Sequence, residues 1–327
     1  MVDVQASIII PAYNEAENIG KCIASILKNT DVQHEIIVVD NGSKDATAEI
    51  AKVMGVTVLS KPKATISALR NSGARCAKGE LLVFLDADMV VPEDFINKGK
   101  KYFDSGFMGA LGFAIIVPSD SGWVARTWGQ PLNSKRERKV EVDFLGGSNI
   151  FIKKIVFEEV GGFDELLNTN EDKDFTMRVA KAGYSLITSY EINVIHLGYE
   201  RDLSEFIRKE FWRQGSTLMF ARHWRFAPST LRNPLLSLWH VGFFLLFISS
   251  LLLYARAGTF LYSLVTLALW LLPALLIALK KAGRNIEYFG LGWFFSFFLL
   301  TFIRWNVSGV SLLVQIVKLF RFRSHNV

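Results

Sequence analysis

Two aspartates, Asp86 and Asp88, follow directly on the apolar run 81–85. Such a run predicts a buried strand, and open α/β sheets bind ligands at the carboxyl ends of their strands. Residues i and i+2 of an extended segment point to the same side, so the two carboxylates would repel each other without a cation between them. Mg²⁺ and Mn²⁺ take oxygen ligands and are commonly completed by substrate phosphates. The pair therefore predicts a metal–diphosphate site, the other interpretation being a solvated loop.

Alternating strands and helices must position this pair. Asn14 is expected to cap the first helix, with Glu15 and Glu17 in its first turn. Strand–helix alternation with short links predicts a parallel sheet covered on both faces. The ligand site should then lie where Pro11-Ala12-Tyr13, Asp40 and Asp86-Ala87-Asp88 converge. The expected strands are 7–11, 35–39, 56–59 and 81–85, and the expected helices follow Asn14 and span 45–53 and 65–77.

The positive charge of the chain lies in its C-terminal part. The net charge is +6, and the residues from Asn233 onward hold eight Lys and Arg but a single acid, Glu287. The high pI therefore gives no reason to expect nucleic acid binding. Basic residues beside apolar runs instead favour association with a membrane that contains anionic lipids. The N-terminus lacks a basic region followed by a long apolar one, so we expect no cleavable signal peptide and a cytosolic front domain. Cys22 and Cys76 are expected to be buried free thiols rather than a disulfide.

Two segments carry alternative interpretations. The irregular stretch 118–142, with its charged run 135–139, is either a solvated loop or a lid that contacts phosphates or lipid headgroups. The stretch 202–226 is rich in both aromatic and basic side chains, which suits an amphipathic helix in the membrane interface or a helix packed on the catalytic domain. We expect a catalytic domain over 1–200 and amphipathic interfacial helices over 201–232.

Residues 233–327 are predicted to form an all-α transmembrane domain of three to four helices. Segments 235–254 and 260–279 each have about 20 apolar residues, enough for one crossing. The basic link 280–284 places the end of the second span in the cytosol by the positive-inside rule. Arg304 interrupts the last apolar stretch. We favour two short spans there, and one span followed by an interfacial helix is the alternative.

Four motifs in order resemble family 2 glycosyltransferases. They are the segments 7–15, 40–47 and 70–74 and the strand end Asp86-Ala87-Asp88. The segments 161–165 and 171–175 resemble the acceptor side of that family. The resemblance covers residues 5 to about 200. It implies a Rossmann-like GT-A fold, with a mostly parallel sheet flanked by helices, and transfer of a sugar from a UDP-, GDP- or dTDP-sugar.

The resemblance implies roles for individual residues. Asp40 would accept a hydrogen bond from the nucleotide base, and Arg70 would bind a phosphate through both terminal nitrogens. Asp86, beside Ala87, would reach the ribose or a metal-bound water, and Asp88 would bind Mn²⁺ or Mg²⁺. The nucleotide-sugar side would be completed by Pro11, Ala12, Tyr13 and Glu15.

His196 is either a further metal ligand, as a late histidine often is in this family, or a structural residue. An imidazole ligand would favour Mn²⁺ over Mg²⁺. Gly147 and Asp164 are placed on the acceptor side by the same resemblance, together with Trp212 and Arg213.

Asp172 is the candidate catalytic base of an inverting transfer, in which it would take the proton of the acceptor hydroxyl. Glu171 or Asp174 could fill that role instead, and Asp172 could simply cap a helix. A lipid phosphate is largely ionised at neutral pH, needs no base and would be repelled by this acid cluster. The cluster therefore favours a hydroxyl on a lipid-linked or other membrane-surface acceptor over a polyprenyl phosphate.

The resemblance stops short of polymer-making relatives, which carry a Gln-x-x-Arg-Trp segment before their later membrane helices. This chain has Phe211-Trp212-Arg213-Gln214-Gly215 there, which favours transfer of a single sugar. Two other classes remain. A nucleotidyltransferase pairs a nucleotide site with two aspartates but needs no acceptor-side acids. A non-catalytic nucleotide-sugar-binding scaffold in a membrane complex has no physical reason to keep clustered carboxylates.

Overall fold

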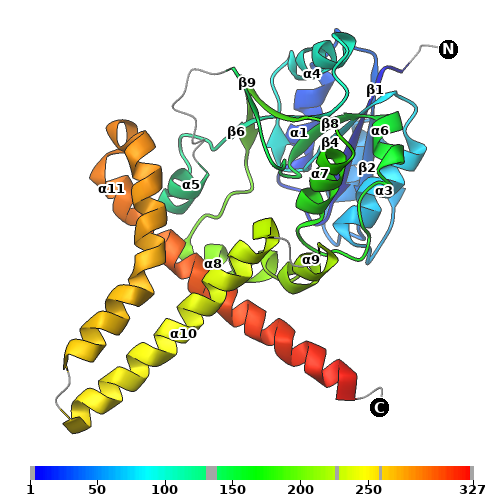
Figure 1. Cartoon of the computed structure of the whole chain (residues 1–327). Helices are drawn as coiled ribbons and strands as arrows, with labels where there is room; N and C mark the ends of the chain where they lie inside the picture. The colour runs from blue at the N-terminus through cyan, green and yellow to red at the C-terminus, as the bar shows by residue number, and fades with distance from the viewer. Residues whose placement is uncertain (1–3, 130–137, 225–227, 258–259, 325–327) are drawn as a thin grey trace. The chain divides into compact units, whose positions relative to one another are not determined.

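A computed structural model describes residues 4–129, 138–224, 228–257 and 260–324. The chain divides into two compact units (Figure 1). Unit 1 comprises residues 1–119 and 135–199, and unit 2 comprises residues 120–134 and 200–327. The stretch 120–134 thus groups with the C-terminal helices. The described part of segment 118–142 contributes a short helix to unit 2 and a strand to unit 1, and its central residues 130–137 lie outside the described residues.

Unit 1 alternates strands and helices from its first strand, as the sequence predicts. Its strands are β1 (Ala6–Ala12), β2 (His34–Asp40), β3 (Thr57–Ser60), β4 (Leu81–Leu85), β5 (Met89–Val90), β6 (Ala110–Ile116), β7 (Lys139–Glu141), β8 (Asn149–Lys153) and β9 (Leu186–His196). Its helices are α1 (Ile19–Leu27), α2 (Thr47–Val53), α3 (Ile66–Cys76), α4 (Phe95–Asp104), α6 (Lys154–Glu159) and α7 (Glu171–Lys181).

The strands form one mixed sheet in the order β3-β2-β1-β4-β8-β6-β9-β5, with β7 beside β9. The first four strands in this order are parallel, and β8 runs antiparallel to β4. The strand order reverses between β1 and β4, which is where open α/β sheets bind ligands. Because β8 is antiparallel, the chain leading into it reaches the same edge as the end of β4, and Asn149 pairs with Leu85.

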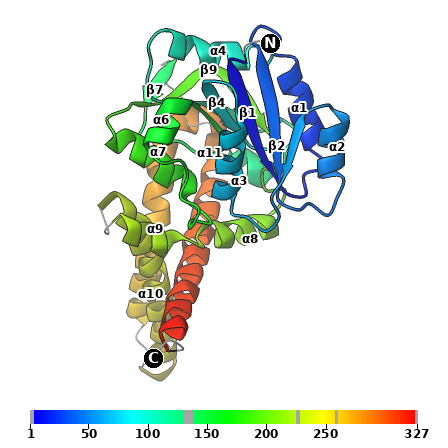
Figure 2. The same ribbon diagram turned by 90° about the vertical axis from the view of Figure 1, so that its right-hand side faces the viewer.

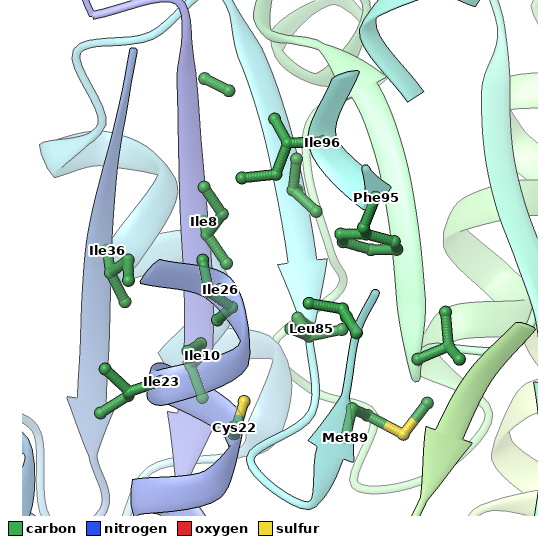
Figure 3. Close-up of a cluster of buried hydrophobic side chains, with 14 of the residues drawn as sticks. Ile8, Ile10, Cys22, Ile23, Ile26, Ile36, Leu85, Met89, Phe95 and Ile96 are labelled. Carbon is green, nitrogen blue, oxygen red and sulfur yellow. The ribbon is translucent and has the colours of Figure 1, made fainter. Parts of the chain in front are cut away.

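Side chains alternate between two cores because successive strand residues point to opposite faces. Ile8 and Ile10 join one apolar cluster and Ile9 joins the other. Cys22 and Ile23 of α1 pack on the first cluster, which Phe95 of α4 also joins (Figure 3). The second cluster lies on the face covered by α3, α6 and α7 (Figure 2).

The first helix begins later than predicted. Asn14 does not cap it, because α1 starts at Ile19 with Asn18 at the cap position and no acid in the first turn. Asn14 instead has a left-handed backbone, and its Oδ1 accepts a hydrogen bond from the Lys44 amide at 2.8 Å. It thereby ties the loop after β1 to the loop after β2. Both cysteines are free thiols as predicted, but only Cys22 is buried, and Cys76 is exposed.

Unit 2 is helical. Its helices are α5 (Trp123–Trp128), α8 (Leu203–Arg213), α9 (Thr217–His223), α10 (Pro228–Ala257) and α11 (Phe260–Ser324). In this unit α8 packs on α5 and α11 through Phe206, Val124 and Leu300. Residues 201–224 thus pack on the long helices of their own unit, a contact that neither interpretation of this stretch named.

Among the described residues, three helical segments are long and apolar enough to cross a membrane: 230–255, 260–282 and 290–317. The expectation of two short spans in the last segment is wrong, because the helix is continuous through Arg304. The break falls earlier, at Gly290, whose φ of 71° redirects the chain (Figure 1). Of the third segment 44% is buried, against 17% and 11% for the first two.

We predict that Gly73→Ala lowers the stability of the protein by about 1–3 kcal/mol. An added Cβ would lie 2.4 Å from Ile9 Cγ2, at the contact of α3 with β1. Gly20→Ala in α1 is the matched control, because its Cβ would meet Ile50 at an ordinary 3.5 Å and alanine favours a helix. Thermal unfolding of the full-length protein in detergent measures both, and equal melting temperatures for the two variants would contradict the prediction.

Candidate active site

Asp86 and Asp88 lie in the tight turn between β4 and β5. The Met89 amide donates to the Asp86 carbonyl at 3.2 Å, and the Asp86 amide donates to the Ser148 carbonyl at 3.1 Å. The pair therefore sits on a turn rather than on extended chain. Burial raises the pKa of the Asp86 carboxyl, the Asp88 charge raises it further, and Arg70 acts in the opposite direction. The two carboxylates are close enough to interact, as predicted.

His196 lies beside Asp88. The short strand β5 pairs antiparallel with β9 and sets Met89 opposite His196. This register brings His196 Nε2 to 3.0 Å from Asp88 Oδ2. Two ligands at right angles on one ion, each about 2.1 Å from it, are also about 3 Å apart. The donor set thus fits a divalent ion, with further positions for water and diphosphate oxygens. Among the described residues no group of three or more His, Cys, Asp or Glu side chains could hold a metal.

Gly198 was not predicted to matter and has a clear local role. A Cβ there would lie 1.8 Å from Asp88 Oδ2. The neighbouring Leu197 amide donates to the Asp88 carbonyl at 2.9 Å, which fixes this close approach. The only signal in the sequence was the position of Gly198 two residues after His196.

Arg70 is fully buried and pairs with two acids. Its Nη2 lies 2.9 Å from Asp86 Oδ1, and its Nη1 lies 2.8 Å from Glu171 Oε1. Nη2 also donates to the Gly147 carbonyl at 3.2 Å. The phosphate contact predicted for Arg70 remains a prediction. In the structure its guanidinium joins β4, α7 and the loop before β8.

Gly147 allows this arrangement. A Cβ on Gly147 would lie 2.7 Å from Arg70 Nη2, so a side chain would push the guanidinium away. The Gly147 amide donates to Asp172 Oδ2 at 2.8 Å. One residue of the loop thus contacts both the buried cation and the candidate base.

The three acids at the start of α7 have different surroundings. Asp174 is fully buried and binds Arg178 at 2.8 Å, so it is a poor candidate for contact with an acceptor. Glu171 is buried against Arg70. Burial, with the adjacent Asp172 charge, raises the pKa of Glu171 to about 7 although Arg70 lowers it. Asp172 is partly exposed and is the most accessible of the three.

The residues predicted for the nucleotide lie at the ends of β1 and β2. Pro11 and Ala12 are buried in β1, whereas Tyr13 is 51% exposed. The Glu15 amide donates to Thr47 at 2.7 Å. Asp40 is buried, and its carboxylate accepts from the Gly42 amide at 3.0 Å and from the Ser43 amide. The structure brings these residues to one edge of the sheet.

The residues predicted for the acceptor side belong to both units, Gly147 and Asp164 to unit 1 and Trp212 and Arg213 to unit 2. Asp164 accepts from the Leu166 amide within its own turn. The neighbouring Phe163 packs against Arg70, whose guanidinium carbon lies 5.3 Å from the centre of the Phe163 ring. Trp212 and Arg213 belong to unit 2, where Trp212 is 60% exposed and Arg213 pairs with Glu200 and Glu210.

The model of the family described as glycosyl transferase family 2 matches residues 7–161. Glycosyltransferase AglE of Haloferax volcanii is 29% identical over 215 residues, which are 63% of this chain and 70% of AglE. The O-antigen chain rhamnosyltransferase RfbN of Salmonella typhimurium is 24% identical over 208 residues, 59% of this chain and 66% of RfbN.

Among solved structures, the mannosyltransferase PcManGT from Pyrobaculum calidifontis, in complex with GDP-Man and Mn²⁺, is similar with a TM-score of 0.59. It is 20% identical, and the match covers 94% of this chain and 87% of PcManGT. The fold and the matching family model define a glycosyltransferase with a GT-A fold. Within that class, this chain carries a glycosyl transferase family 2 domain, followed by three candidate membrane helices. Asp172 and His196 lie beyond the matched segment.

We predict that Glu171→Gln changes how stability depends on pH. The folded carboxyl has a pKa of about 7 and the unfolded one about 4.5, so the folded state binds more protons between these values. Wild-type stability therefore falls as pH rises through this window, and Glu171→Gln lacks this loss. The free energy of unfolding of the variant, relative to that of the wild type, should therefore rise by on the order of 2 kcal/mol from pH 5 to pH 8. Unfolding of full-length protein at several pH values measures the difference. Exposed Glu93→Gln is the control and should follow the wild-type profile. A Glu171→Gln profile that also runs parallel to that of the wild type would contradict the prediction.

Gly198→Ala is predicted to weaken Mn²⁺ binding at least tenfold, because the methyl group displaces the Asp88 carboxylate. Titration of full-length protein followed by the electron paramagnetic resonance signal of free Mn²⁺ measures the affinity. Gly146→Ala is the matched control, since its Cβ would come no closer than 4.0 Å to Asp172. An unchanged Mn²⁺ affinity in Gly198→Ala would exclude Asp88 as a metal ligand.

Proposed function

We propose that this glycosyltransferase works with inversion and moves one sugar from a nucleotide sugar to a hydroxyl of a lipid-linked acceptor at a membrane surface. The observation that carries the proposal is the convergence of the Asp88–His196 pair, the Arg70 network and Asp172 at the ligand-binding edge of a family 2 domain.

The donor would bind over the carboxyl ends of β1, β2 and β4. Tyr13 is exposed there and offers a ring for contact with the nucleoside. The Asp40 carboxylate is held in place by the Gly42 and Ser43 amides and keeps acceptor capacity for the edge of a base. PcManGT is in complex with GDP-Man, which supports a nucleotide sugar as the donor without identifying its base or sugar here.

Asp88 and His196 would hold a divalent ion. The bound ion would neutralise charge on the departing nucleoside diphosphate. Asp86 is kept beside this pair by Arg70 and by the turn, and could contact the ribose or a metal-bound water. The Mn²⁺ in the PcManGT complex supports Mn²⁺, and Mg²⁺ is the alternative.

Asp172 would remove the proton from the acceptor hydroxyl as that oxygen attacks the anomeric carbon opposite the leaving diphosphate. The Gly147 amide holds one carboxylate oxygen of Asp172, and the partly exposed side chain keeps further acceptor capacity. Glu171 acts on this geometry indirectly, because its pairing with Arg70 anchors the first turn of α7. Asp174 already forms an ion pair with Arg178, so Asp172 is the favoured base.

The acceptor side favours a hydroxyl. Three acids occupy the first turn of α7, and an ionised lipid phosphate attacking there would be repelled. The three candidate membrane helices on the same chain tether the catalytic domain to a bilayer, where lipid-linked acceptors reside. The basic residues between the second and third helices favour a cytosolic catalytic domain.

We predict that full-length protein in detergent, given Mn²⁺ and a membrane lipid extract, releases nucleoside diphosphate from one of the UDP-, GDP- or dTDP-sugars. Asp172→Asn should lower this release about 10²–10⁴-fold, because the general base is lost while binding remains. Asp88→Ala should abolish it by removing a metal ligand. Colorimetric detection of nucleoside diphosphate measures each rate.

Asp104→Asn is the control for removal of a carboxylate, because Asp104 is an exposed residue at the end of α4 that pairs with Lys100. It should keep wild-type release. Lipid-dependent release that is unchanged in Asp172→Asn would exclude Asp172 as the base and favour a phosphate acceptor. Release of pyrophosphate would identify a nucleotidyltransferase instead.

A further inference from the structure

One face of the third candidate membrane helix carries a row of polar side chains. Thr301, Trp305 and Ser308 are spaced four and three residues apart and share a helical face, and Arg304 lies next to Trp305 at the edge of that face. We call these four residues the donor row. Thr301, Trp305 and Ser308 are each at most 3% exposed.

Each member of the donor row has a buried polar atom that makes no hydrogen bond within the described residues. These atoms are Thr301 Oγ1, Arg304 Nε, Trp305 Nε1 and Ser308 Oγ. The arginine and tryptophan nitrogens can only donate, and each hydroxyl can donate one hydrogen bond. A buried polar group without a partner costs several kcal/mol in an apolar setting. The row is thus suited to a ligand with several acceptor oxygens.

Other polar groups in the same helices are satisfied by the protein. The Trp239 indole donates to the Leu269 carbonyl at 2.8 Å, and the Trp270 indole donates to Asn306 at 3.1 Å. Ser250 bonds Ser263 at 3.2 Å. The donor row therefore gathers four buried atoms without a hydrogen bond within eight residues of one helix, and His240 Nε2 of α10 is a further such atom among the described residues.

Two positively charged side chains, Arg304 of the donor row and Lys281, lie near one aromatic ring. The Arg304 guanidinium carbon lies 5.2 Å from the centre of the Trp128 ring, and Lys281 Nζ lies 5.9 Å from the same ring. Lys281 Nζ is also 4.3 Å from the centre of the Phe297 ring. Two cations at one aromatic ring repel each other, and an anion beside them would relieve that repulsion.

Glu210 already provides one negative charge beside Arg304. Arg304 Nε lies 3.3 Å from Glu210 Oε2, but neither atom makes a hydrogen bond there. Glu210 instead accepts from Arg213 Nη1 through its other oxygen at 2.8 Å. The His240 ring lies near Trp305, with 6.4 Å between ring centres.

We propose that the donor row, with Lys281, binds the phosphate group of a membrane lipid. A phosphate ester offers several charged acceptor oxygens, which matches neighbouring donors and two cations. Its lipid chain suits the apolar surroundings of the candidate spans. The purpose of this site rests on the proposed function, since a lipid-linked sugar acceptor presents a phosphate together with the sugar hydroxyl. The phosphate of a bulk anionic phospholipid has the same chemistry.

The test replaces three donors by apolar groups of nearly the same shape, in the variant Thr301→Val/Trp305→Phe/Ser308→Ala. Full-length protein in neutral detergent is titrated with a polyprenyl diphosphate, with phosphatidylglycerol and with inorganic phosphate, and bound lipid is counted by native mass spectrometry. We expect the variant to bind the preferred lipid 10–100-fold more weakly, because hydrogen bonds to a charged group are lost. Without lipid, its melting temperature should be unchanged or higher, since the removed groups had no partners.

Trp239→Phe is the matched control, because it removes an indole N–H that is already satisfied within the protein. It should bind lipid as the wild type does. Preference for polyprenyl diphosphate would support the inference and identify the lipid carrier as the ligand. Equal binding of both lipids would support it with bulk phospholipid as the ligand. Equal affinity of wild type and triple variant, or binding of neither lipid by the wild type, would overturn it.

A parallel titration of the wild type with nucleotide sugar and Mn²⁺ separates this inference from the proposed function. Donor binding without lipid binding overturns the lipid site and leaves the transferase. Lipid binding without any donor binding supports the lipid site and contradicts the transferase.

Discussion

The candidate active site depends on one buried cation. Arg70 is held between Asp86 and Glu171 and against the Gly147 carbonyl, so a single guanidinium joins β4, α7 and the loop before β8. A buried pair adds little net stability, but removing one partner leaves an unpaired charge in the interior, which is strongly unfavourable. The three segments are therefore constrained together. The absence of a side chain at Gly147 is the geometric condition for this contact.

The positive charge of Arg70 also offsets the negative charges of the acids close to it. Desolvation raises the pKa values of the half-buried Asp86 carboxyl and the buried Glu171 carboxyl, and Arg70 counteracts that effect on each. The acids then fall into two groups with different tasks in the proposed mechanism. Asp88 and His196 would hold the metal, and Asp172 would take the proton of the acceptor. A transferase needs this division, because the leaving diphosphate and the attacking hydroxyl develop charge on opposite sides of the sugar.

Sequence patterns predicted the strands β1 to β4 and their end-of-strand acids well, because local hydrophobic runs define them. The resemblance left His196 open between a further metal ligand and a structural residue, and its pairing with Asp88 depends on the β5–β9 register, which no local pattern encodes. The partners of Arg70 were missed because they lie 16 and 101 residues away in the chain. The roles of Gly147 and Gly198 depend on close approaches that exist only in the folded chain. The length of the last membrane helix was misjudged because Arg304 looked like an end and instead joins unit 2 through Glu210 and Trp128.

The central claim is that the site transfers a sugar with inversion. The most direct measurement is the anomeric configuration of the product made by the full-length protein from the nucleotide sugar it accepts. The one-bond carbon–hydrogen coupling at the anomeric carbon, measured by nuclear magnetic resonance, reports it. An anomer opposite to that of the donor is the predicted result. Retention of the donor's configuration would contradict the mechanism, because direct attack by a hydroxyl that Asp172 deprotonates can only invert.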